Sequence, residues 1–290
     1  MKQNFQKGLI VLMVTGWSAA YLSADTVELT GHGDFVGTFT ISSAPNQNEP
    51  ALTGYGGGFS AEIIGNSPSQ SYLTTVFCVD FSNDVSLPSS HSVNLTPIAA
   101  GTQFTDDTRF GAVTAWRPVE DYLPGGLTLS AGVQNTIDNA TALERYEMAA
   151  YLVSNYTFFG QAPPQSDNYY GDATNRGIQS AIWAILDPTS DLYLPPSSLS
   201  DSGDITLWLT NAANWLANDS STAAGQQLLS RFRVVSDAQI AGSANPTQVG
   251  IQEFLTVQPV PEPGFYAVLA PGLAVVWWTA RRKRRARLTA

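Results

Sequence analysis

The order of patterned segments constrains the fold most, because strand-like segments flank a helical stretch. Alternating apolar and polar residues, punctuated by glycine, predict strands in the first third of the chain and again near residue 250. These segments are 26–42, 59–64, 72–81, 91–99, 232–237 and 251–258. Helical spacing predicts helices at 142–156, 172–187, 204–218 and 223–232. We therefore expect an α+β fold: a β-sandwich or barrel-like domain with a small helical subdomain inserted at about 142–229.

The N-terminal residues have the pattern of a secretory signal peptide. Lys2 and Lys7 supply positive charge, and residues 9–22 are mostly apolar. Cleavage is expected after Ala20 or Ala24, so residues 1–24 are predicted to be removed. The alternative is an uncleaved N-terminal anchor.

The C-terminal residues have the pattern of a single transmembrane helix. Residues 265–280 carry no charge, and as a helix they would span about 24 Å, slightly less than the ~30 Å hydrocarbon core. A basic cluster follows, which is expected to hold this end on the cytoplasmic side of the membrane. It consists of Arg281, Arg282, Lys283, Arg284, Arg285 and Arg287. Residues 25–257 are then expected to face outward as one body.

A short motif precedes this predicted helix. Pro261, Glu262 and Pro263, then the apolar span, then the basic cluster, occur in that order. Residues 258–290 thereby resemble the PEP-CTERM sorting signal of proteins that Gram-negative bacteria export. The resemblance implies processing by exosortase, a membrane protease-transpeptidase, and then a location at the cell surface or outside the cell. The alternative is a plain C-terminal anchor with a proline-rich linker.

The charge of the body limits its partners. Residues 25–260 contain 23 acidic residues, six arginines and no lysine. Nucleic acid binding needs basic patches, so no nucleic-acid partner is expected. The three lysines, Lys2, Lys7 and Lys283, all lie in the two end segments.

The single cysteine, Cys78, lies within a predicted strand. The period-two rule places it on one face of the strand, and we expect the opposite face to be the sheet core. Cys78 would then point toward the helical insertion. The predicted core face comprises Leu73, Thr75, Phe77, Val79 and Phe81, and the face of Cys78 also carries Tyr72, Thr74, Val76 and Asp80.

Gln179 lies in a predicted helix, on the same face as Ile182, Trp183 and Leu186. A buried amide without hydrogen bonds costs about 1–3 kcal/mol, so this side chain is expected to have a partner. One alternative is an ordinary hydrogen bond to the backbone. The other is covalent: the Cys78 sulfur replaces the amide nitrogen and a thioester joins strand to helix.

The segments "FCV" (77–79) and "IQSAI" (178–182), followed by Trp183, resemble the paired motifs of the thioester domains of bacterial surface proteins. The resemblance spans about residues 60–190. It implies a β-rich domain with a helical part and an internal thioester between Cys78 and Gln179. It also implies covalent attachment to nucleophiles on a target surface. A thioester survives only where water is excluded, and Phe77, Tyr72, Ile182 and Trp183 are the side chains expected to shelter it.

We therefore expect an exported adhesive or matrix protein that acylates an amine-bearing target, with no enzymatic activity, cofactor or metal. The alternative is a noncovalent structural or glycan-binding protein of an extracellular polysaccharide matrix, in which Cys78 and Gln179 only pack. Trp116 could then stack on sugars, whereas the helical spacing of Trp208 and Trp215 favours core positions. An extracellular hydrolase is a weaker alternative, because His32 and His91 are the only histidines and no nucleophile-elbow motif is present.

Overall fold

The computed structural model describes ten segments of the chain: 25–30, 35–42, 52–65, 71–80, 87–123, 127–156, 173–186, 192–194, 202–242 and 250–258. The predicted signal peptide (1–24), the Pro261–Pro263 motif, the 265–280 span and the 281–287 basic cluster lie outside these segments. Within them, no helix has the length and apolar character needed to cross a membrane.

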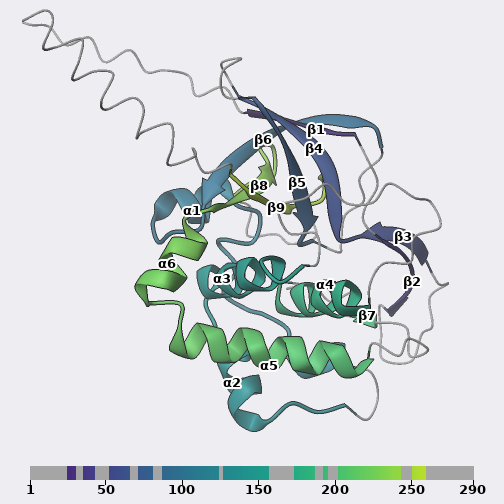
Figure 1. The fold of residues 1–290 in the computed structure, drawn as a ribbon, viewed down its shortest axis with the longest axis vertical. Coiled ribbons are helices and arrows are strands. Elements are labelled where there is room, and N and C mark those ends of the chain that lie inside the picture. Colours follow the sequence, from purple (N-terminus) through teal and green to yellow (C-terminus); the bar gives the residue numbers. More distant parts are fainter. Residues whose placement is uncertain are drawn as a thin grey trace, which may run out of the picture.

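Six antiparallel strands form a closed barrel in the order β1-β4-β5-β9-β8-β6 (Figure 1). β8 and β9, from the end of the described chain, pair with each other and fill the gap between β5 and β6. The barrel confirms the α+β, barrel-like prediction. Its strands are β1 (Asp25–Leu29), β4 (Gly58–Ile64), β5 (Tyr72–Cys78), β6 (Ser89–Pro97), β8 (Phe232–Asp237) and β9 (Phe254–Val257).

A second, three-stranded sheet has the order β3-β2-β7 and is also antiparallel. It consists of β2 (Phe35–Ser42), β3 (Leu52–Gly56) and β7 (Leu192–Leu194). Only Gly57 separates β3 from barrel strand β4. Its φ of 85° lies in the left-handed region, which glycine adopts without steric cost.

Most of the helices between β6 and β8 lie under one end of the barrel, whereas α1 lies beside β6 and β8; β5 runs toward α3 and α4 (Figure 1). They begin before the predicted start at residue 142, because α1, the short 3-10 helix η2 and α2 precede it. α3 begins with a capping box in which Thr141 and Glu144 exchange hydrogen bonds. The helices are α1 (Thr102–Asp107), η2 (Val119–Tyr122), α2 (Ala131–Asp138), α3 (Ala142–Val153), α4 (Ala173–Leu186), α5 (Ser202–Asn218) and α6 (Ala223–Leu229).

The prediction of which β5 face is the sheet core is wrong. Phe59 and Ile63 are buried residues of the barrel interior, and they lie opposite Val76 and Tyr72 in the β4–β5 register. The alternate residues of β5, ending at Cys78, therefore face inward, whereas Leu73 points outward and is 79% exposed.

The error has a physical reason. The outer face of β5 begins in solvent at Leu73 but ends under cover at Phe77, which is buried and packs on Tyr156 with ring centroids 5.0 Å apart. Both faces are apolar where the strand ends, so alternation alone could not tell them apart.

This assignment predicts that two substitutions on β5 have very different effects on the free energy of unfolding. Val76→Ala removes methyl groups from the barrel interior and should lower the free energy of unfolding by about 2 kcal/mol. Leu73→Ala should change it by no more than about 0.5 kcal/mol, because the side chain is largely in solvent. Urea unfolding of the full chain measures both. An equal or larger loss in Leu73→Ala would contradict the inward orientation of Val76.

Candidate functional site

Cys78 ends strand β5 and is completely buried, with an exposed fraction of 0%. Its sulfur faces two nitrogen donors from distant parts of the chain. Trp183 Nε1 in α4 lies 3.3 Å from Sγ, and Gln252 Nε2, just before β9, lies 2.7 Å from it. Sγ in turn lies 3.4 Å from the carbonyl oxygen of Asp80. The thiol is therefore enclosed by polar groups at the end of the barrel that the helices cover.

Gln179 lies in α4 and is also 0% exposed. Its Nε2 donates to the carbonyl oxygen of Cys78 at 2.8 Å. Its Oε1 accepts two hydrogen bonds, from the backbone N–H of Gly57 at 3.0 Å and from the Tyr156 hydroxyl at 2.7 Å. The carboxamide thus meets Cys78 across the strand–helix interface, with its carbonyl oxygen held by two donors.

Each donor to Gln179 has a local reason for its position. Gly57 joins the second sheet to the barrel in a left-handed conformation, and its own carbonyl accepts the Cys78 N–H at 3.2 Å. Tyr156 lies just after the end of α3 and packs on Phe77. Gly57 therefore contacts both halves of the pair, and Tyr156 joins α3 to α4.

The structure brings together four of the six residues predicted for the thioester and its shelter. Trp183 and the Gln179 carboxamide hydrogen-bond to Cys78, and Phe77 packs on Tyr156, the donor to Gln179. Ile182 is buried on the same helix, α4. Tyr72 is separate. It begins β5, six residues from Cys78, which for a strand is about 20 Å. Tyr72 is thus placed too far along the strand to cover the sulfur.

Three contacting residues were not predicted from the sequence: Gly57, Tyr156 and Gln252. Only the glycine run at residues 56–58 offered a signal, since repeated glycine often marks a tight turn or a close approach of the backbone. Gln252 and Tyr156 carry no local signature. They reach the site because β9 pairs with β5 and because α3 packs beside α4.

The arrangement has two chemical properties that acyl chemistry needs. Two donors on the Gln179 carbonyl oxygen polarise it and would stabilise negative charge on that atom during attack at the carbon. Two N–H donors at the Cys78 sulfur would stabilise it as a departing thiolate. The same hydrogen bonds also satisfy a buried amide in a noncovalent structure, so the geometry is compatible with both alternatives drawn from the sequence.

A second buried polar cluster adjoins the site. Asp80, two residues after Cys78, forms a buried ion pair with Arg109. Glu253 accepts hydrogen bonds from the Tyr146 and Ser236 hydroxyls and, at 2.8 Å, from the backbone N–H of Arg109. Gln252 connects this cluster to the cysteine, because its Nε2 also donates to the Asp80 carbonyl at 2.7 Å.

Burial raises the pKa of the Glu253 carboxyl above its ordinary value, although its hydrogen bonds and Arg109 act in the opposite direction. Burial and the neighbouring Glu253 also raise the pKa of Tyr146, which therefore stays a neutral hydrogen-bond donor. Through Tyr146, Arg109 and Glu253, the cluster connects α3, the residues after α1 and the residues before β9 in one hydrogen-bond network.

The raised pKa of Glu253 predicts how stability depends on pH. The folded chain holds this proton to a higher pH than the unfolded chain does. The free energy of unfolding should therefore fall as pH rises from the ordinary glutamate value of 4.5 through the raised pKa. Glu253→Gln cannot titrate and should lose this component of the slope. Urea unfolding from about pH 4 to about pH 8 measures it.

The matched control is Glu120→Gln, since Glu120 is exposed and outside the cluster. It should keep the wild-type slope. A Glu253→Gln variant with an unchanged slope would show that Glu253 titrates at its ordinary pKa.

Comparisons with known proteins show no matching family model, no similar curated protein and no similar solved structure. In the part of the chain that the structure describes, no group of three or more histidine, cysteine, aspartate or glutamate side chains is arranged to hold a metal ion.

Proposed function

We propose that this protein is an exported surface or matrix protein that attaches covalently to amine-bearing targets through a thioester between Cys78 and Gln179. The observation that carries the proposal is that both residues are 0% exposed and that the Gln179 carboxamide donates to the backbone carbonyl of Cys78 at 2.8 Å. The pair was predicted from sequence motifs a hundred residues apart, and its proximity supports that prediction.

In the first step, the Cys78 sulfur attacks the side-chain carbonyl carbon of Gln179. A C–S bond forms and the C–N bond of the carboxamide breaks. The amide nitrogen leaves as ammonia and takes up the thiol proton. Gly57 N–H and the Tyr156 hydroxyl face the oxygen on which negative charge develops.

In the second step, a target amine attacks the same carbon. A new amide bond forms, the C–S bond breaks, and the amine proton returns to the departing Cys78 sulfur. Trp183 and Gln252 face that sulfur. The complete burial of both residues protects the thioester from water and requires local opening before an amine can reach it. The absence of lysine from residues 25–260 prevents the body from quenching itself through a side-chain amine.

The location belongs to the same proposal. The order of Pro261–Pro263, the apolar span and the basic cluster supports export, retention at the inner membrane and processing by exosortase before the body reaches the surface. The rival function is a passive matrix protein, in which the hydrogen bonds from Gln179 and Trp183 to Cys78 only join α4 to β5.

The proposal predicts a loss of mass. The wild-type chain should weigh about 17 Da less than its unmodified sequence, because one ammonia is released. The full chain is compared with a Cys78→Ser variant prepared in the same way, so that processing of the ends affects both equally. Methylamine should then appear as a methylamide on the residue 179 side chain in peptide mapping of the wild type alone.

A full-mass wild-type chain with a titratable thiol after unfolding, and no label at residue 179, would show that Cys78 and Gln179 only pack. The protein would then have the passive matrix role.

A second prediction concerns the donors to Gln179. Tyr156→Phe removes one of the two groups on the carbonyl oxygen, and loss of one such donor typically slows acyl chemistry by about 10²–10³-fold. The fraction of chains with the mass deficit should fall accordingly. Tyr151→Phe is the matched control, since Tyr151 stacks on Trp215 and lies away from the pair. If the fraction of chains with the mass deficit is equal in both variants, Tyr156 takes no part in the chemistry.

A further inference from the structure

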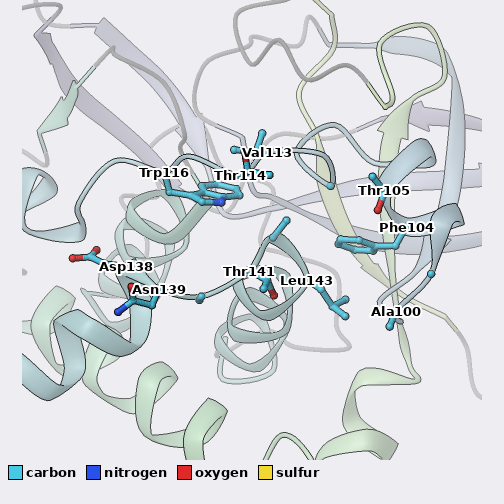
Figure 2. Close-up of a pocket in the computed structure, with 14 residues that line it drawn as sticks. Ala100, Phe104, Thr105, Val113, Thr114, Trp116, Asp138, Asn139, Thr141 and Leu143 are labelled. Carbon is cyan, nitrogen blue, oxygen red and sulfur yellow. The ribbon is translucent and has the colours of Figure 1, made fainter.

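A groove of about 590 Å³ lies on the helical side of the molecule, and its lining residues are distinct from those around Cys78 and Gln179. It runs between α1 and residues 111–116 on one side and the turn that joins α2 to α3 on the other (Figure 2). Phe104 lies toward one end, and Asp138 and Asn139 lie toward the other. The groove is therefore elongated, with an aromatic side chain in each half.

Trp116 presents its ring to the groove in a defined way. The Arg145 guanidinium lies 4.4 Å from its ring centroid and covers one face, and Phe110 meets it edge-on with centroids 6.3 Å apart. Only the opposite face can receive a ligand. The ring is partly exposed, although its neighbours Phe110 and Arg145 are buried. Such a fixed, partly exposed indole is suited to stacking against a flat ligand with C–H groups on its face.

Polar groups surround this ring. Thr105 and Thr114 line the groove, and both residues are exposed. Asn139 uses its Nδ2 to donate to the Asn135 carbonyl, and its Oδ1 can accept a ligand hydroxyl. Asp138 Oδ1 accepts the Val119 N–H at 2.8 Å, and the second oxygen of this carboxylate can accept a charge-assisted hydrogen bond from a ligand hydroxyl. The groove thus combines hydroxyl donors with carbonyl and carboxylate acceptors.

The charge of the groove favours an uncharged ligand. Among the described residues that line the groove, Asp138 is the only ionisable one, and the Arg145 guanidinium interacts electrostatically with it. An anionic ligand would meet a carboxylate without a cation in the lining. A cationic ligand would compete with Arg145 for Asp138.

The elements around the groove also disfavour a peptide. The lining contains residues of α1, α2, α3 and loops but none of the described strands. Within the described residues, the groove therefore offers no strand edge to which an extended peptide could add.

From these features we infer that the groove binds a neutral oligosaccharide, with one pyranose ring stacked on Trp116 and the hydroxyl groups of the sugars on Thr105, Thr114, Asp138 and Asn139. Burial of C–H groups against the indole and hydrogen bonds to fixed acceptors are both used by concave small-molecule sites. This activity is independent of the thioester, and it would hold the body on a glycan surface without a covalent bond.

The test is calorimetric titration of the full chain with three neutral hexasaccharides: cellohexaose, maltohexaose and mannohexaose. The charged probes are hexagalacturonate and the chitosan hexamer, and an uncharged glycine–serine hexapeptide represents the peptide class. We expect at least one neutral hexasaccharide to bind and the other three probes to fail.

Two variants locate the binding. Trp116→Ala should weaken it by about tenfold or more. Because Trp116 also packs on Arg145, Thr105→Arg provides a second variant that places a long side chain from an exposed position into the groove. Gln227→Arg, exposed on α6 and outside the groove, adds the same charge and should bind like the wild type.

Absence of binding by all three neutral hexasaccharides would overturn the inference. Binding that survives Thr105→Arg, or binding of the hexapeptide or a charged probe that Thr105→Arg abolishes, would overturn it as well. A Cys78→Ser chain that still binds the sugar would show that the groove acts without the thioester, so the two proposals fail or succeed separately.

Discussion

The pairing of β9 with β5 is the constraint on which the rest of the structure depends. It closes the barrel, because β8 then bridges β9 to β6. It also carries Gln252 and Glu253 to the end of β5, where one contacts the cysteine and the other the buried cluster around Arg109. Strands about 175 residues apart thereby build a site that neither could form alone. All the described helices lie between these strands in the chain. Barrel closure therefore fixes the positions at which the chain enters and leaves the helical part.

Burial makes the polar groups at this end of the barrel mutually dependent. A buried amide or carboxylate without partners costs several kcal/mol. Gln179 has three hydrogen bonds, and Glu253 accepts from two hydroxyls and one backbone N–H. Removing one member leaves another without a partner, which is why such networks give a single well-defined arrangement. The precise placement that this gives to the Gln179 carbonyl is also what acyl chemistry at that carbon requires.

The two proposed activities suit a protein that acts at a surface. A thioester reacts once, so a covalent bond is useful only after the body is held against its target. A groove for neutral sugars would first bind the target reversibly, and the proposed thioester would then attach the protein irreversibly. The groove lies beside the first residues of α3, and Tyr156 lies just beyond the last residue of that helix. The same helix thus contributes to both places.

The sequence by itself determined the principal local elements and the two residues that are proposed to react. Alternation and helical spacing predicted the principal strands and helices, and the lone cysteine and the glutamine within an apolar helix face identified Cys78 and Gln179. It could not determine which face of β5 points inward, because Phe77 and Cys78 lie on opposite faces and are both buried where the strand ends against the helices.

Only the tertiary structure decided that Tyr72 lies away from the sulfur and that Gly57, Tyr156 and Gln252 surround the pair. These contacts join residues far apart in the chain through strand register and helix packing, and neither leaves a periodic signal in the sequence. Local spacing reports which face of an element a residue occupies. It does not report what the closed barrel brings to that face.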